Sequence, residues 1–306
     1  MIMSKSALPE RKRPKLKQSK RNAIEYALFL VVPLSLYVVF FIVPNITTYV
    51  YSLFKYDGFS NFEFIGIQNF VRLMSDRKFG MAFKNTLVYT GATVIGQNAL
   101  ALVFAVLIVK QTRINNIFKT TFYLPAIMSS IAIGFIWGFI LDPNLGVINN
   151  LFKDIGLPAF AQNWLGNRNI VMFSISAIHI WQAVGGATII FISGLLNIPN
   201  ELNECANIDG ANKLQVFFRI TFPMLRPVTI INVVLTTIGC FKSFDYVYVM
   251  TAGGGDGSSH VLATWLFRNG FQFREMGYAS AMAVVLSLTA AILAFAQFRL
   301  NRDEID

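Results

Sequence analysis

Long apolar stretches, separated by short polar pieces, restrict the fold of this chain more than any other feature. A helix needs about 20 apolar residues to cross the hydrocarbon core of a bilayer. Of the 306 residues, 55% are hydrophobic and only 14% are charged, whereas a soluble domain needs more polar residues to cover its surface. The pattern predicts an all-α membrane protein with six transmembrane helices, over residues 26–53, 86–109, 120–141, 170–195, 228–249 and 278–300.

The first apolar stretch is longer than a bilayer requires and contains Pro33 and Pro44. Proline removes a helical hydrogen bond, so we expect this span to be kinked and to extend past the lipid boundary. The stretch is too long for the core of a signal peptide and lacks a small-residue cleavage site. It is therefore expected to be retained.

The basic residues gather at the N-terminus. A basic tail directly before an apolar span is typical of a cytoplasmic N-terminus, and six spans then place both termini in the cytoplasm. The Lys and Arg residues of the loops alone do not decide which side of the membrane each loop faces. The predicted organisation is a basic tail over 1–25, a six-span domain over 26–300 and a short tail over 301–306. Without a basic face interleaved with aromatic residues, nucleic-acid binding is not expected. The tail contains Lys5, Arg11, Lys12, Arg13, Lys15, Lys17, Lys20 and Arg21.

The sequence contains no set of residues that points to catalysis. Cys205 is predicted in a cytoplasmic loop and Cys240 inside a span, so they are not expected to pair, and neither has a metal-ligand neighbour at a suitable spacing. The two histidines, His179 and His260, have no carboxylate or thiol partner at an interpretable spacing. We therefore predict no catalytic residue, no metal site and no enzymatic activity.

The loop between the fourth and fifth predicted spans, residues 199–227, has the pattern of a helix, a break and a second helix. Glu201 and Glu204 lie near the start of the first helix, where negative charge is favourable, and Gly210 can end that helix in a left-handed conformation. A helical elbow with exposed apolar residues can dock into a groove of another protein, or it can lie on the membrane surface. The residues alone leave both alternatives open. The second helix carries Leu214, Phe217, Phe218 and Thr221 at helical spacing, up to Pro223.

The same loop resembles the EAA loop of binding-protein-dependent ABC importer permeases. It contains Glu204-Cys205-Ala206, then three residues, then Gly210, and later Ile220-Thr221-Phe222-Pro223. Cys205 replaces an alanine of the family pattern and Phe222 replaces a leucine, and both departures are mild. From about residue 26 to 300, further stretches are similar to the carbohydrate-uptake branch, and to its MalF-like subunit in particular. These stretches are residues 64–70, 122–125, 163–166 and 244–255.

The resemblance implies the type I ABC importer permease fold in a bacterial cytoplasmic membrane. A second, MalG-like permease subunit would complete the pathway, an ATPase dimer would bind ATP and Mg²⁺, and an extracytoplasmic sugar-binding protein would deliver the substrate. This chain would hold no cofactor, which agrees with its lack of a Gly-x-x-x-x-Gly-Lys-Ser/Thr phosphate-binding loop. The EAA loop would be the coupling helix. Glu204 and Asp209 would make polar contacts with the ATPase, and Ala206 and Gly210 would allow close approach. Ordinary helix start and stop chemistry is the alternative for these four residues.

A sugar pathway needs hydrogen-bonding groups and aromatic faces inside the bilayer. In the fourth span His179, Gln182 and Gly186 share one helix face, beside Trp181. In the fifth span the residues on one face are Thr236, Cys240 and Ser243. Polar groups in lipid are often functional, but helix packing uses small and weakly polar residues as well.

Two other transport functions are alternatives. An ion-coupled secondary transporter usually has charged or broken-helix sites near the midplane, and the predicted spans hold almost no acidic residue. A permease for a glycerol-phosphate-type polyol would need Arg or Lys along the pathway, and no predicted span has one near its middle. A neutral sugar, an oligosaccharide in particular, is the favoured substrate.

Overall fold

The computed structural model describes residues 26, 29–60, 62–110, 112–254 and 257–299. The chain divides into two compact units, Met1–Val50 and Tyr51–Asp306. The described residues are mostly helical, and the strands among them form one short antiparallel hairpin. The all-α fold class is thus confirmed, whereas the predicted tails over 1–25 and 301–306 lie outside the described residues.

The first unit contains one apolar helix, which runs from Phe29 to Tyr51 and so reaches the first residue of the second unit. A π-helical turn over Val38–Ile42 precedes α2, Val43–Tyr51. Pro44 lies just after this turn, and because proline cannot donate the helical hydrogen bond, an irregular turn next to it has a clear cause. The helix ends at Tyr51, two residues before the end of the predicted span over 26–53.

The second unit contains three more helices that are long and apolar enough to cross a membrane: α4, Arg77–Ile108; α8, Val171–Leu196; and α15, Met276–Arg299. Two bent helix pairs pass the same test if each pair counts as one span. The described residues therefore hold between four and six spans.

The third predicted span, over 120–141, is wrong as a continuous helix. α5, Arg113–Tyr123, continues into a 3-10 turn over Leu124–Ile127, and α6, Ser130–Ile140, leaves at 95° to this segment. Pro125 lies in the turn and removes one donor from the helical ladder. The apolar residues run on through the break, so hydropathy does not reveal it. α7, Val147–Asp154, and a 3-10 turn over Pro158–Phe160 follow.

The fifth predicted span, over 228–249, is also interrupted. α12, Arg226–Phe241, ends before Lys242, and α13, Asp245–Thr251, is a separate helix with Asp245 in its first turn. A carboxylate at that position is favourable for a helix start, so two helices replace the predicted one. α14, Leu262–Phe267, then continues into a π-helical turn over Arg268–Gln272.

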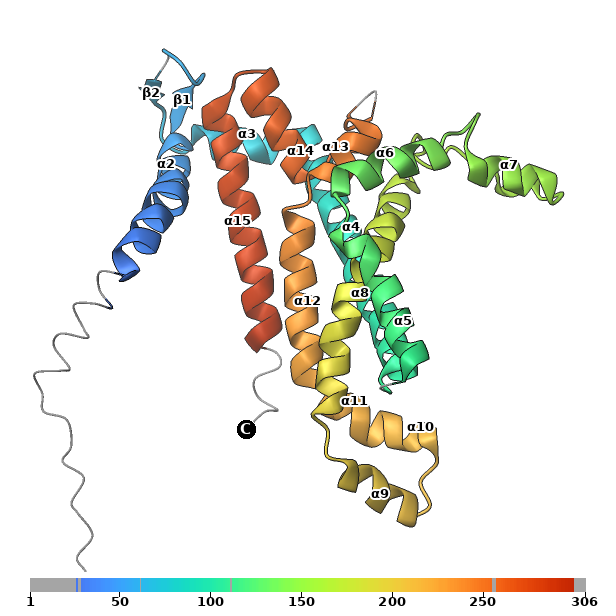
Figure 1. The fold of residues 1–306 in the computed structure, drawn as a ribbon. Helices are drawn as coiled ribbons and strands as arrows, with labels where there is room; N and C mark the ends of the chain where they lie inside the picture. The colour runs from blue at the N-terminus through green and yellow to red at the C-terminus, as the bar shows by residue number, and fades with distance from the viewer. Residues whose placement is uncertain (1–25, 27–28, 61, 111, 255–256, 300–306) are drawn as a thin grey trace, which may run out of the picture. The chain divides into compact units, whose positions relative to one another are not determined.

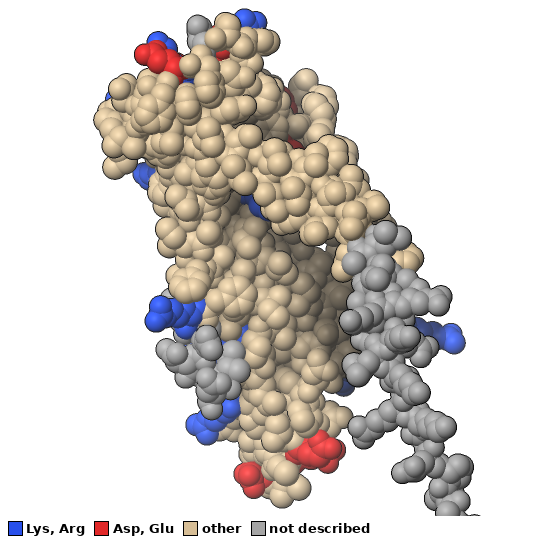
Figure 2. Space-filling model, turned by 90° about the vertical axis from the view of Figure 1, so that its left-hand side faces the viewer, with Lys and Arg blue, Asp and Glu red and all other residues tan. Residues whose placement is uncertain are grey.

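The core of the second unit lies where α4 packs along α8, with α12 and α15 beside them (Figure 1). Small residues such as Ala101, Ala105 and Ala187 are buried between α4 and α8, and small residues allow helix backbones to approach closely in membranes. In Figure 2 the visible Asp and Glu side chains lie toward the two ends, and uncharged surface covers most of the face between them. This distribution fits a bundle whose middle lies in lipid.

The two ends of this bundle differ. At one end an elbow, defined as residues 199–224, projects beyond the long helices (Figure 1). The elbow contains α9, Asn200–Ile208; α10, Lys213–Val216; a π-helical turn over Phe217–Thr221; and α11, Phe222–Met224. At the other end lies a cap, defined as residues 54–76 and 245–275. The cap contains β1, Phe54–Tyr56, paired with β2, Phe62–Phe64, as well as α3, Gln68–Ser75, and the helices α13 and α14.

Candidate functional site

The first candidate site is the elbow, whose predicted helix–break–helix form is confirmed. α9 ends at Asp209, and Gly210 has a left-handed backbone with a φ of 80°. The amide of Ala211 donates to the carbonyl of Ala206 at 2.9 Å, and the amide of Gly210 donates to that of Asn207 at 3.1 Å. These bonds satisfy the last carbonyls of α9, so Gly210 ends this helix as predicted.

The second helix of the elbow starts with a capping box. The side chain of Asn212 accepts from the amide of Gln215 at 2.9 Å, and the side chain of Gln215 accepts from the amide of Asn212 at 2.8 Å. Such reciprocal bonds fix the first turn of a helix. The turn between α9 and α10 is therefore held at both sides by local hydrogen bonds, which makes the elbow a defined shape.

The elbow presents apolar side chains to its surroundings. Ile208 is 85% exposed, Leu214 is 70% exposed and Phe218 is 63% exposed, and α9 has no buried residue. Glu204 and Asp209 are exposed beside them, while Ala206 is half-buried. Exposed apolar residues rimmed by polar ones mark an interaction surface.

The second candidate site is a polar cluster inside the bundle. The hydroxyl of Tyr89, on α4, lies 2.6 Å from Nδ1 of His179, on α8, and 3.0 Å from the hydroxyl of Ser243. The ring of His179 also stacks on the ring of Tyr246, with centroids 4.9 Å apart. Three parts of the chain that are distant in sequence thus meet at one polar point.

Gln182 extends the cluster. Its side-chain oxygen accepts from the hydroxyl of Tyr246, and its side-chain nitrogen donates to the carbonyl of Met128 at 2.8 Å. Met128 lies in the break between α5 and α6, where helical hydrogen bonds are missing. Gln182 thus joins that break to the first turn of α13 and satisfies backbone that would otherwise lack a partner.

The predicted pathway residues do not all meet in one place. His179, Gln182 and Ser243 meet in the cluster, whereas Cys240 is buried in the adjoining hydrophobic core. Thr236 is buried and accepts from Gln97 at 3.3 Å. Trp181 is 43% exposed and contacts Trp137, and Gly186 is half-buried with open space where a Cβ would lie.

The sequence reasoning missed two cluster residues, Tyr89 and Tyr246, as well as Gln97, the partner of Thr236. Each is a polar residue inside a predicted span, so the cost of placing polar groups in lipid could have singled them out. Their partners lie on other helices, and no spacing along one helix reveals such a contact.

The chain matches the family of binding-protein-dependent transport system inner membrane components over residues 97–305. It is 34% identical to the probable ABC transporter permease protein YurN of Bacillus subtilis over 282 residues, which cover 91% of this chain and 96% of that protein. It is also 30% identical to the multiple sugar-binding transport system permease protein MsmF of Streptococcus mutans over 275 residues, covering 90% and 94%. The chain therefore belongs to the family of binding-protein-dependent transport system inner membrane components.

The fold also matches a solved structure, a bacterial alginate ABC transporter in complex with an alginate pentasaccharide-bound periplasmic protein. The TM-score is 0.81 at 23% identity, and the match covers 94% of this chain and 96% of that chain. The expected resemblance to carbohydrate ABC importer permeases and the type I permease fold are thus confirmed. The chain is a multi-pass membrane protein and a transport subunit rather than an enzyme.

Proposed function

We propose that this chain is one of two membrane-spanning subunits of an ATP-driven, binding-protein-dependent importer of a neutral oligosaccharide. It would form half of the pathway with a MalG-like permease subunit, take substrate from an extracytoplasmic binding protein and couple to an ATPase dimer through the elbow. Both termini and the elbow would then lie in the cytoplasm. The projecting elbow with its exposed apolar residues, in a chain of this family, is the observation that carries the proposal.

The charges of the long helices favour a neutral substrate. α8 contains no charged residue, α12 has only Arg226 at its first position, and α15 has only Arg299 at its last. A phosphate ester crossing beside these helices would lack a cationic partner near the middle of the bundle. The name of MsmF, which refers to multiple sugars, is in line with a saccharide as the substrate class.

In a pathway between two subunits, the lining side chains are those that remain exposed to solvent in a single subunit. His179, Ser243 and Gly186 are half-buried and Trp181 is exposed, so these four can contact the sugar. Gln182, Thr236 and Cys240 are buried, and they would hold the lining residues in place. Hydroxyl, imidazole and indole groups match the hydroxyls and apolar faces of a sugar.

In the elbow, Glu204 and Asp209 would make polar contacts with the ATPase, and Ala206 and Gly210 would allow it to approach closely. An added Cβ at Gly210 would meet no atom within 4 Å in this chain. A large side chain there would consequently clash with the docked ATPase and not with the elbow itself. The left-handed backbone adds strain of about 1 kcal/mol for a non-glycine residue, so a control with the same strain is needed.

The chain offers such a control in Gly156, which has a φ of 78° and equally open space, but lies between α7 and the 3-10 turn that follows it. The experiment is to purify the tagged chain from native membranes in mild detergent and to identify what accompanies it. We expect a second permease and an ATPase with the wild type and with Gly156→Arg, and loss of the ATPase alone with Gly210→Arg.

The opposite results are informative. If the chain is recovered alone or as a homo-oligomer, the elbow is a membrane-surface helix and ion-coupled transport becomes the better explanation. If both arginine variants keep the ATPase, coupling does not pass through Gly210. Transport of labelled oligosaccharides, with sugar phosphates as competitors, then tests the proposed substrate class.

A further inference from the structure

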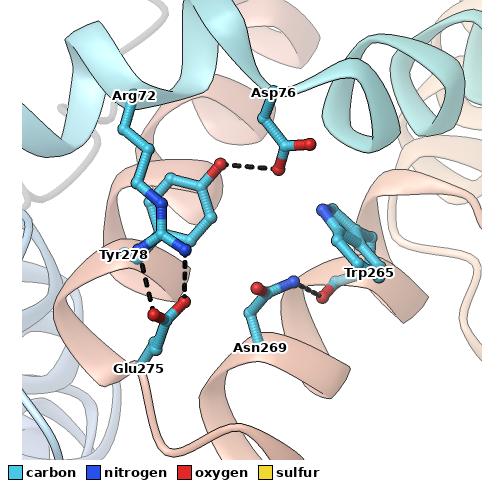
Figure 3. A network of polar contacts seen from close by, with 6 residues as sticks. All are labelled: Arg72, Asp76, Trp265, Asn269, Glu275 and Tyr278. Atoms are coloured by element: carbon cyan, nitrogen blue, oxygen red, sulfur yellow. Dashed lines mark hydrogen bonds and ion pairs between the residues drawn. The ribbon is translucent and has the colours of Figure 1, made fainter.

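A second polar site lies in the cap, away from the cluster around His179. It is a pocket of about 410 Å³ between the corner that joins α3 to α4 and the segment that joins α14 to α15 (Figure 3). A single water occupies about 30 Å³ in the liquid, so the pocket has room for a small organic molecule. We call it the cap pocket; its lining residues are Arg72, Ser75, Asp76, Trp265, Asn269, Phe273 and Glu275.

The walls of the cap pocket are held by mutual contacts. The guanidinium of Arg72 donates to both carboxylate oxygens of Glu275, at 3.0 and 2.9 Å, and lies 4.0 Å above the ring of Tyr278. The hydroxyl of Tyr278 donates to Asp76 at 2.7 Å (Figure 3). A bidentate pair fixes geometry as well as charge. The pocket is therefore built before any ligand arrives, which reduces the entropy lost on binding.

Asp76 is an ionised acceptor at neutral pH. Burial alone would raise the pKa of its carboxyl, but hydrogen bonds from the Tyr278 hydroxyl and from the amides of Phe79 and Lys78 keep this pKa below its ordinary value. The same carboxylate caps α4 by accepting from Lys78 at 2.8 Å. The charge is thus a fixed part of the pocket.

The lining groups retain hydrogen-bonding capacity of both kinds. A carboxylate offers about four acceptor positions and a guanidinium five donors, whereas Arg72 and Glu275 use two bonds between them. The side chain of Asn269 donates to the carbonyl of Trp265 at 2.8 Å and, like any amide, has a second donor and an acceptor. A ligand group that both donates and accepts, such as a hydroxyl, matches this mixture.

The charges around the pocket have no single sign. The carboxylates of Asp76 and Glu275 oppose an anion, while Arg72, together with Lys78 above the ring of Trp265 and Arg268 above that of Phe273, opposes a cation. Phe273 lines the pocket, is 50% exposed and contributes apolar ring surface. Mixed polar groups beside an aromatic face suit a molecule with hydroxyls and an apolar ring surface.

We propose that the cap pocket binds one unit of a neutral saccharide, as a site separate from the pathway cluster. The choice of saccharide rests on the proposed function, as does the view that the pocket faces the side from which substrate arrives. A sugar held there would be close to the chain before it enters the pathway.

The test measures binding to the full chain in lipid nanodiscs by saturation-transfer difference NMR. The probes are maltotriose, cellotriose and raffinose, with glucose 6-phosphate and glucosamine as charged probes. Phe273→Ala removes the apolar face, and Phe271→Ala is the matched control, because Phe271 is 62% exposed on the same turn but does not line the pocket. Gln182→Ala separates cap binding from pathway binding.

We expect at least one neutral trisaccharide to bind with saturation and more tightly than either charged probe. Phe273→Ala should weaken it about 2- to 12-fold, the range that corresponds to one lost aromatic contact. Phe271→Ala and Gln182→Ala should leave this binding unchanged. The proposal is refuted if no trisaccharide binds, if the two phenylalanine variants behave alike, or if binding depends on Gln182 alone. Because this readout requires neither the ATPase nor transport, its failure would leave the importer proposal intact.

Discussion

A close approach of two backbones makes a sharp prediction for Gly185, on α8. A Cβ added at this residue would lie 2.1 Å from the carbonyl oxygen of Phe122 and 2.8 Å from the Cα of Tyr123, both at the end of α5. These are backbone atoms, so no side-chain rotation can relieve the contact. Gly185→Ala must therefore push α5 away from α8.

The size of the effect follows from this geometry. Real Cβ contacts essentially never fall below 3.0 Å, so the two helices must separate by roughly 1 Å in a close-packed interior. Overpacking of this kind costs about 1–3 kcal/mol. Gly186→Ala is the matched control, because a Cβ there meets nothing within 4 Å and alanine gains up to about 1 kcal/mol of helix propensity. Gly185→Ala has the same gain, because both residues lie inside α8, so the two variants should differ by the overpacking cost, about 1–3 kcal/mol in their free energy of unfolding.

Reversible unfolding of the purified chain in mixed micelles, with increasing SDS, measures this difference. Gly185→Ala should unfold at a lower SDS fraction than wild type, and Gly186→Ala at the same or a higher one. Equal stability of the two alanine variants would refute the reasoning, because it would mean that α5 and α8 do not meet at Gly185. If Gly185→Ala and Gly186→Ala are destabilised equally, the loss comes from introducing alanine into this part of α8 and not from a contact specific to Gly185.

Three further predictions follow from buried or loop contacts. Tyr246→Phe leaves the buried Gln182 oxygen without its donor, so unfolding in mixed micelles should show a loss of about 1–3 kcal/mol. Asn149→Ala removes four hydrogen bonds within residues 143–164 and should speed amide exchange there, unlike Asn150→Ala at an exposed neighbour with one long bond. Burial and nearby cations lower the pKa of His260 to about 4. Between pH 6.5 and 4 the unfolded chain therefore binds more protons than the folded chain, so the stability of the fold should fall as the pH drops through that window. The loss of stability between pH 7 and pH 4.5, measured by thermal melting, should be smaller in His260→Gln.

The sequence was informative wherever the decisive interactions are local. Runs of about 20 apolar residues predict spans because lipid acts on each segment separately. The ends of α9 and α10 are determined by Gly210 and Asn212 through bonds within a few residues. The breaks within the third and fifth predicted spans were missed because hydropathy is averaged over a window longer than either break. In addition, the break in the third span is stabilised by a tertiary contact, between Gln182 and Met128, which the sequence does not reveal.

Some contacts of the predicted pathway residues could be foreseen from the sequence and others could not. Helical spacing placed His179 and Gln182 on one face, and both lie in the polar cluster. Their partners Tyr89 and Tyr246 are 90 and 64 residues away from them in sequence, a separation at which spacing carries no information. The cap pocket is built from segments at the ends of helices, so neither hydropathy nor helical spacing indicates it.

The arrangement of the two candidate sites gives the proposed coupling a direct mechanical route. The elbow continues into α8 on one side and into α12 on the other, and these helices carry most of the predicted pathway residues. From Gln182 to the end of α8 at Leu196 a helix spans about 20 Å, so a rigid displacement of the elbow reaches the cluster along unbroken helix. The bond from Gln182 to Met128 crosses to the broken third span, which does not connect to the elbow. A shift of α8 would therefore change this bond, together with the contact of His179 with Tyr89 on α4, and both would report the movement of the elbow at the cluster.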